Sequence, residues 1–379
     1  MTFKRFDLLV SKKIPSYNKN IKVDADKSIS IRSFLIGAIS ENLSTVNNVL
    51  ESEDVYSTIN SLKKLGIKIK KQKAKKYLIF GKGLGSLHTK KIIKLNFGNS
   101  GTLARLLIGI LATTSGVKVK IFGDHSLNKR SMKSLINLMT KFGASFLPKN
   151  KFNLPLKLIS SEMPVGINYK TGVSAQLKSA VMLAGLNSFG ETKIIETLRS
   201  RNHTENMLLN NPHIISVQEK QKKIIKIFGK KYLNSINIEV PGDPSSSAFF
   251  SALTLLKENS TLKIKDVGLN KTRTGFYQIL KKQGAKIKFK NLKNKSKELR
   301  GDIIVKSCKL KPIYAPKEYY VNTTDEYPIL FIMAALIKGV SIFKGISDLA
   351  NKESNRIVEM QNILNQINVK SSFLKDEFK

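Results

Sequence analysis

The sequence predicts an α/β protein of two lobes, built from a unit of helices and strands that repeats along the chain. The chain has 379 residues, of which 41% are hydrophobic, and this length favours two cores over one. Five apolar segments of helix length recur at intervals of about 70–80 residues. Each is followed by a short β-rich segment and then by an amphipathic helix pattern.

The five apolar segments predict buried helices, because they are hydrophobic nearly all the way round. They are SISIRSFLIGAIS from Ser28, SGTLARLLIGILA from Ser100, SAQLKSAVMLAGL from Ser174, SSSAFFSALTLL from Ser245 and YPILFIMAALIKG from Tyr327. The strands predicted after them are STVNNVL, GVKVKIFG, GETKIIETL, STLKIKDVG and GVSIFKGIS. An amphipathic helix and a second strand then close each unit, and Gly66, Gly143 and Gly284 stand where helix C-caps belong.

Three units fit before about Val240 and two after it. If the units pack in threes around their buried helices, the second group is one unit short. We therefore predict one lobe of residues 25–240 with three units. We predict a second lobe of residues 1–24 plus 241–379 that lacks its C-terminal unit.

The composition argues against several classes of protein. The longest apolar runs are too short to span a bilayer, and the basic N-terminus lacks the apolar run of a signal peptide, so we expect a cytoplasmic protein. A single cysteine, Cys308, excludes an intramolecular disulfide; it lies in a strand-like stretch and predicts a buried, inert thiol. The histidines are not spaced as metal ligands, so we expect no metal.

The net charge of +39 has three interpretations. It could reflect nucleic-acid binding through a basic face, steering of anionic substrates, or a bias that places lysine at every tolerant surface position. The lysines form no single stripe and no RNA-binding aromatic motif accompanies them, which favours the compositional bias.

Several predicted buried helices begin at residues suited to binding an anion, because a helix N-terminus presents free N–H groups. In VDADKSISIR, the helix start carries Lys27, Ser28 and, one turn inside, Arg32. Gly101 in LNFGNSGT would let a backbone approach a ligand closely. TGVSAQLKSA places three polar or small residues at the next such start: Ser174, Ala175 and Gln176. Ordinary capping and tight turns are the alternatives.

Charged residues on loops could reach the same place. Arg130 lies in GDHSLNKRSM, and Arg201 lies in LRSRNHTENML. Asp325 precedes the last buried helix, where a favourable interaction with the helix dipole is the alternative explanation. NKESNR holds three charges within one turn: Lys352, Glu353 and Arg356. A surface ion pair would explain these equally well.

The order of these motifs is more specific than any one of them. From about Val23 to Asn368 the sequence resembles EPSP synthases, and SAQLKSA, RNHTE, NKTRTG, DEYPIL and KESNR are similar to the bacterial branch called class II. The resemblance implies the two-lobed enolpyruvate transferase fold, an inside-out α/β barrel of βαβαββ units, with about five of six units present. It implies hinges near residues 22–25 and 239–242.

The resemblance also implies the reaction. Family members transfer the enolpyruvyl group of phosphoenolpyruvate to the 5-hydroxyl of shikimate 3-phosphate and release phosphate, without a cofactor. Contacts with shikimate 3-phosphate are implied for Lys27, Ser28, Arg32, Ser174, Ala175, Gln176, Arg201, Asp325 and Lys352. Contacts with phosphoenolpyruvate are implied for Lys27, Gly101, Arg130, Gln176 and Arg356. The catalytic residues would be Asp325, which takes the hydroxyl proton, and Glu353 with Lys27, which move the methylene proton.

The family continues with a sixth unit that carries a DHR-type motif and a later lysine, both for phosphoenolpyruvate. This sequence ends before that unit, so we expect nearly complete contacts with shikimate 3-phosphate and fewer with phosphoenolpyruvate. One alternative is a non-catalytic protein that only binds shikimate 3-phosphate. A related UDP-sugar enolpyruvyl transferase is a second alternative, disfavoured because that relative carries a reactive cysteine on a loop, whereas we expect Cys308 in a strand. We expect a monomer that acts on these small molecules and binds neither membranes nor nucleic acid.

Overall fold

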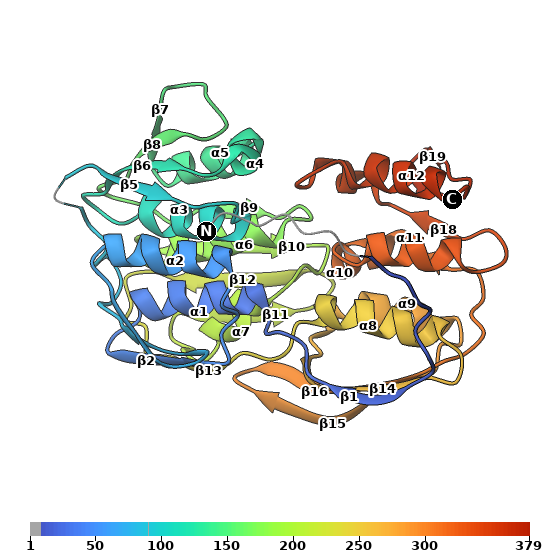
Figure 1. The fold of residues 1–379 in the computed structure, drawn as a ribbon. Helices are drawn as coiled ribbons and strands as arrows, with labels where there is room; N and C mark the ends of the chain where they lie inside the picture. Colours follow the sequence, from blue (N-terminus) through green and yellow to red (C-terminus); the bar gives the residue numbers. More distant parts are fainter. Residues whose placement is uncertain (1–8, 90) are drawn as a thin grey trace.

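The computed structural model describes residues 9–89 and 91–379; residues 1–8, part of one predicted lobe, lie outside the described residues. The apolar side chains form two hydrophobic cores. One core runs from Ala25 to Val240, and the other runs from Ala248 to Phe378. We call the parts built on these cores the large lobe and the small lobe; Figure 1 shows them side by side. Across the described ranges, no helix has the length and apolarity needed to cross a membrane.

All five predicted apolar helices are present. In the large lobe they are α1 (Lys27–Ile39), α3 (Gly101–Ala112) and α6 (Ala175–Asn187). In the small lobe they are α8 (Pro244–Leu256) and α11 (Tyr327–Ala335). The three helices of the large lobe are buried almost all the way round, as expected from their sequences.

The prediction of complete burial was wrong for α8 and α11. Phe249, Phe250 and Leu253 on α8 are 52%, 47% and 40% exposed, and Leu336 at the end of α11 is 65% exposed. The physical reason is the number of helices that pack against each apolar helix. Each buried helix of the large lobe packs against other helices on more than one side. In the described residues, α8 packs on α11 and on the sheet below it, which leaves one apolar face uncovered.

Five four-stranded sheets have the same order of strands, which confirms the repeated unit. In each sheet an edge strand pairs in parallel with the strand that follows the buried helix. Two antiparallel strands then complete the sheet. The sheets of the large lobe contain β2 (Leu43–Asn47), β3 (Lys68–Lys73), β4 (Lys76–Phe80) and β13 (Asn237–Glu239); β5 (Ile93–Asn96), β6 (Lys118–Phe122), β7 (Ser145–Leu147) and β8 (Leu156–Ile159); and β9 (Asn168–Lys170), β10 (Glu191–Glu196), β11 (Ile215–Glu219) and β12 (Lys223–Phe228).

The sheets of the small lobe repeat the pattern. They contain β1 (Asn18–Ile21), β14 (Thr261–Gly268), β15 (Ile287–Lys295) and β16 (Glu298–Lys306), and β17 (Tyr314–Ala315), β18 (Ile342–Lys344), β19 (Phe373–Leu374) and β20 (Glu377–Phe378). The amphipathic helices are α2 (Glu53–Lys64), α5 (Lys133–Lys141), α7 (His203–Leu208), α9 (Gly275–Lys282) and α12 (Arg356–Gln366). Gly66, Gly143 and Gly284 have positive φ angles just past three of these helices, which confirms them as C-caps.

Two segments cross between the lobes side by side. The edge strand β1 precedes the large lobe in sequence but belongs to a sheet of the small lobe, while β13 returns to the first sheet of the large lobe. Where the segments cross, Asp26 N–H donates to the Pro241 carbonyl, and Asp243 N–H donates to the Asp24 carbonyl. The crossing therefore sets the two helices that follow it, α1 and α8, next to each other.

The contact between α3 and α6 gives a test of the packing in the large lobe. A Cβ atom at Gly109 would lie 2.6 Å from the Ala180 carbonyl oxygen, which is backbone and has little freedom to move. We predict that Gly109→Ala lowers the free energy of unfolding by about 1–3 kcal/mol, because it forces the two helices apart. Gly172→Ala, whose Cβ would have no neighbour within 4 Å, should change it by less than about 0.5 kcal/mol. Urea denaturation of both variants measures the difference, and equal stabilities would contradict this account.

Candidate active site

A cavity of about 830 Å³ lies between the lobes, and every candidate site residue lines it. From the large lobe come Lys27, Ser28, Arg32, Gly101, Arg130, Ser174, Ala175, Gln176 and Arg201. From the small lobe come Asp325, Lys352, Glu353 and Arg356. Residues from distant parts of the chain therefore converge on one volume, although the contacts predicted for each remain predictions.

Three buried helices begin at this cavity. Each has a side chain that caps its first turn: Asp26 accepts from Ile29 N–H, Ser100 from Leu103 N–H, and Ser174 from Leu177 N–H. The first helical residues, Lys27, Gly101 and Ala175, line the cavity. The positive ends of three helix dipoles thus open on one volume, which favours anionic ligands.

Arg32 is held rigidly at the wall of the cavity. Its Nε donates to Thr204 Oγ1 at 3.0 Å and one terminal nitrogen donates to the Ser28 carbonyl at 3.0 Å. The side chain is buried, and burial lowers the pKa of Arg32 to about 10, so it remains a cation at neutral pH. The other terminal nitrogen donates to Ser179 Oγ at 3.4 Å, and among the described residues no carboxylate forms an ion pair with Arg32. A buried cation without a counter-charge attracts an anion strongly.

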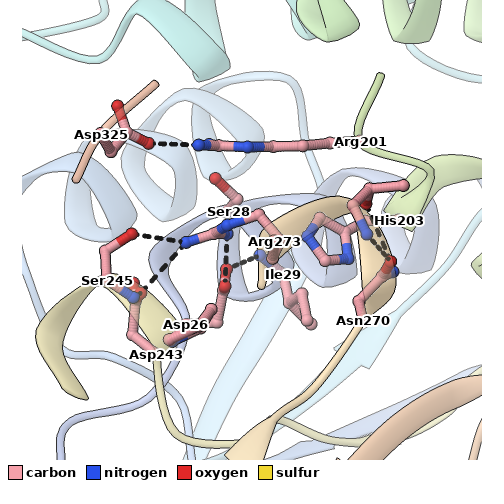
Figure 2. A network of polar contacts seen from close by, with 12 residues as sticks. Asp26, Ser28, Ile29, Arg201, His203, Asp243, Ser245, Asn270, Arg273 and Asp325 are labelled. Atoms are coloured by element: carbon pink, nitrogen blue, oxygen red, sulfur yellow. Dashed lines mark hydrogen bonds and ion pairs between the residues drawn. The ribbon is translucent and has the colours of Figure 1, made fainter. Parts of the chain in front are cut away.

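Asp325 is paired across the cavity. Arg201 of the large lobe donates to Asp325 Oδ2 at 2.5 Å, as Figure 2 shows, and Arg356 lies 3.4 Å from its other oxygen. Burial raises the pKa of this carboxyl, but the positive charges of Arg201 and Arg273 outweigh burial, so its pKa lies well below the usual range. Asp325 is therefore ionised at neutral pH, and it is a weak base while the arginines hold it.

Glu353 is paired in the same way. Arg130 of the large lobe lies 3.6 Å from one carboxylate oxygen, and Arg356 donates to the other at 2.8 Å. Burial raises the pKa of Glu353, but a hydrogen bond from its own N–H group and the two arginines lower it overall. Glu353 thus occupies a place between two guanidinium groups that also suits a ligand carboxylate or phosphate.

Three charged residues that line the cavity were missed from the sequence: Asp54, Arg105 and Asp348. Asp54 lies 3.0 Å from Lys27, and Asp348 accepts from Lys352 at 2.6 Å. Arg105 carries a signal that could have identified it, since it is the one charge within an otherwise apolar helix, α3. Its pKa is lowered to about 10 by burial and by Arg130.

Cys308 corrects one expectation. It lies beyond the end of β16 rather than within a strand, and it is partly exposed rather than buried. It does not line the cavity between the lobes. The prediction placed Cys308 in a strand because the strand-like sequence continues past the last paired residue of β16. β-branched residues alone do not mark where strand pairing stops.

Glu326, next to Asp325, is a buried carboxyl. It accepts a hydrogen bond from Ser245, and its second oxygen has no partner among the residues described. Burial and the negative charge of Asp325 raise the pKa of Glu326 to about 7, although Arg273 and Arg201 oppose the rise. Glu326 is therefore the carboxyl of this group that changes charge near neutral pH.

The fold and the cavity define an α/β enzyme with two lobes and a cleft for anionic substrates. A sequence profile described as EPSP synthase (3-phosphoshikimate 1-carboxyvinyltransferase) matches residues 12–379. A 3-phosphoshikimate 1-carboxyvinyltransferase of Paramagnetospirillum magneticum is 38% identical over 89% of this chain and 76% of its own length. One from Zymomonas mobilis is 38% identical over 95% of this chain and 80% of its own length.

Solved structures agree with the sequence relatives. An EPSP synthase of Acinetobacter baumannii superposes with a TM-score of 0.83 and 34% identity, covering 96% of this chain and 82% of that one. The chain therefore belongs to the EPSP synthase family. This is the enzyme family of the shikimate pathway that transfers the enolpyruvyl group of phosphoenolpyruvate to shikimate 3-phosphate. These findings confirm the fold and the reaction that the sequence predicted.

The titration of Glu326 gives a test through stability. Its reference pKa is 4.5 and its folded pKa is about 7, so between these values the folded state binds more protons than the unfolded state. Its stabilising contribution is complete below pH 4.5 and is lost as pH rises through 7. We predict that the free energy of unfolding falls between pH 5 and pH 8 less steeply in Glu326→Gln. Urea denaturation across this range measures both slopes, and parallel curves would contradict the assignment.

Proposed function

We propose that this chain binds shikimate 3-phosphate and phosphoenolpyruvate together in the cavity and catalyses their condensation with the residues that line it. The observation that carries this proposal is one cavity shared by all the candidate residues, in which cations of the large lobe face carboxylates of the small lobe. Both substrates carry a phosphate and a carboxylate, so each needs several cationic partners.

Shikimate 3-phosphate would lie against the helix starts of the large lobe. Lys27 and Ser28 at α1, and Ser174 and Ala175 at α6, supply N–H groups, hydroxyls and an ammonium on one side of the cavity. Arg201 would exchange its contact with Asp325 for the substrate phosphate. Release from Arg201 raises the pKa of Asp325 toward its usual range, so the arriving substrate makes this carboxylate a stronger base.

Phosphoenolpyruvate would take the place that Glu353 occupies between Arg130 and Arg356. Both arginines are largely buried in the cavity wall, whereas the Glu353 side chain is 54% exposed and can move. Gln176, whose Nε2 donates to Thr102 Oγ1 at 3.1 Å, would lie between the two substrates. A displaced Glu353 loses two positive neighbours, so its pKa rises and it can carry a proton.

The chemistry then needs one base and one acid. Asp325 accepts the proton of the 5-hydroxyl while that oxygen bonds to C2 of phosphoenolpyruvate, and C3 receives a proton from Glu353 or Lys27. In the second step C3 returns a proton, the C2–C3 double bond forms again, and the bond from C2 to the phosphate oxygen breaks. Two carboxyls in different environments can thus serve opposite roles in one reaction.

We also propose that the two lobes, residues 25–240 and residues 1–24 plus 241–379, close about the crossing segments when both substrates are bound. Closure would exclude water and strengthen each ionic contact in the cavity. We propose that the chain acts as a monomer in the cytoplasm. The residues proposed above for both substrates all belong to this chain, and phosphorylated substrates do not cross membranes unaided.

Asp325→Asn tests the base. We expect turnover to fall by about 10²- to 10⁴-fold, because the hydroxyl proton then has no acceptor. We expect affinity for shikimate 3-phosphate to hold or improve, since one negative charge near an anionic ligand is gone. Steady-state kinetics measures the first effect and calorimetry the second.

Glu318→Gln is the matched control, because Glu318 is an exposed carboxylate of the small lobe outside the cavity. Turnover retained in Asp325→Asn would contradict the role of Asp325. If the unaltered chain binds shikimate 3-phosphate without forming product, the non-catalytic alternative is supported and the proposed function is rejected.

Arg130→Met tests the phosphoenolpyruvate contact. A charged hydrogen bond to a ligand contributes about 1.5–3 kcal/mol, so we expect the KM for phosphoenolpyruvate to rise at least about tenfold. The affinity for shikimate 3-phosphate should change little. Arg199→Met serves as the control, since Arg199 donates to the Lys220 carbonyl outside the cavity. An equal loss of affinity for both substrates would contradict the proposal that they bind at separate subsites.

A further inference from the structure

Arg273 joins the two lobes beneath the cavity. It ends a short 3₁₀ turn, Lys271–Arg273, in the small lobe and is 3% exposed. One terminal nitrogen donates to Asp26 of the large lobe at 2.8 Å. The other donates to Asp243 at 3.1 Å and to Ser245 at 2.9 Å, both in the small lobe (Figure 2). One buried guanidinium therefore bridges residues that are far apart in sequence and belong to different cores.

Two of the three partners of Arg273, Asp26 and Asp243, are the residues that cap α1 and α8. Asp26 also accepts from Ile29 N–H at 2.8 Å at the start of α1, and Asp243 accepts from Ser245 N–H at 2.7 Å at the start of α8. Because each aspartate is fixed to its helix, Arg273 adds a side-chain link to the backbone hydrogen bonds of the crossing, and together they hold the two helix N-termini at a fixed distance. The first helical residue of α1 is Lys27, in the cavity.

The same arginine is linked to the segment that carries Asp325. Ser245, which accepts from Arg273, donates to Glu326, the neighbour of Asp325. The segment after Arg273 also packs closely there, since a Cβ atom at Gly275 would lie 2.0 Å from Thr323 Oγ1. Arg273 thus contacts the start of α1 directly and the Asp325 segment through one serine and one glutamate.

Further polar contacts surround this bridge and join the same two lobes. His203 of the large lobe lies 2.8 Å from Glu298 of the small lobe, and Asn270 donates to Asn202 at 2.7 Å. These groups are buried or nearly so, unlike the pair Arg201–Asp325 in the cavity. The contacts below the cavity are therefore shielded from solvent, while those within it are open to a ligand.

We propose that Arg273 is a positioning residue that fixes Lys27 and Ser28 of the large lobe relative to Asp325 of the small lobe. Arg273 touches neither substrate in this account and does not line the cavity. It acts through Asp26 on one side and through Ser245 and Glu326 on the other. The expected effect on turnover rests on the roles proposed above for Lys27 and Asp325. The expected effect of Arg273 on the relative position of the lobes does not rest on them.

A matched pair of variants separates the two arms of the bridge. Asp26→Asn removes the charge on the arm that crosses between the lobes, and Asp243→Asn removes the charge on the arm that stays within the small lobe. Asparagine caps a helix as well as aspartate does, so both variants keep their caps. Arg273→Met removes both arms at once.

The distance between the lobes is the readout, because loss of stability alone does not change it in the folded state. Spin labels at Lys120→Cys and Lys338→Cys, exposed sites in different lobes, report it in a Cys308→Ser chain. We expect a broader distance distribution for Asp26→Asn and Arg273→Met, and an unchanged one for Asp243→Asn. Lys178→Met, which removes a buried cation within the large lobe alone, should also leave it unchanged.

Kinetics provides the second readout. We expect Asp26→Asn to lower kcat at least tenfold, with Asp243→Asn closer to the unaltered chain, and Arg273→Lys to recover part of the loss of Arg273→Met. Equal distance distributions for Asp26→Asn and Asp243→Asn would overturn the proposal, even if Arg273→Met fails to fold. An unaltered chain that binds no substrate would reject the proposed function instead, and the distance measurement would still decide the role of Arg273.

Discussion

The structure depends on one electrostatic constraint: cations that face a partly buried cavity need counter-charges when no substrate is bound. An unpaired buried charge is costly, and the chain reduces this cost by pairing two arginines of the large lobe with carboxylates of the small lobe. Arg201 pairs with Asp325, and Arg130 pairs with Glu353. The carboxylates that neutralise the cavity are the same ones proposed to move protons. These ion pairs therefore stabilise the cavity when no ligand is bound, and their carboxylates would take part in proton transfer when the substrates are bound.

This economy links binding to reactivity. While the arginines hold Asp325 and Glu353, the pKa of each carboxyl stays low, and neither is an effective base or acid. A phosphate or carboxylate that takes over an arginine frees the carboxyl and raises its pKa toward its usual range. Proton transfer would then become favourable only after the substrates arrive. Because each pair joins one lobe to the other, the same exchange also alters what holds the lobes together.

Much of the fold could be predicted because each element has a local sequence pattern and the unit repeats five times along the chain. Apolar helices, β-rich strands and cap glycines such as Gly143 each leave a pattern within about 15 residues, and the repeat makes each one more certain. The candidate site residues came from motif order, and all of them line one volume, although Asp54, Arg105 and Asp348 in the same lining were missed. Arg273 could not be assigned this way, because its partner Asp26 lies 247 residues away. The exposed face of α8 also depends on neighbours that its own sequence does not encode.

The contacts between the lobes are of two kinds, which differ in how deeply they are buried. This difference allows the cavity contacts to exchange while the helix N-termini stay aligned. The pairs in the cavity are open to solvent, with the Asp325 side chain 37% exposed, so an anionic substrate can replace them. The bridge from Arg273 to Asp26 is at most 3% exposed on either side, so no ligand competes for it. Screening by water and salt weakens the first kind and leaves the second nearly intact. The buried bridge can therefore keep two helix N-termini in register while the contacts above it exchange.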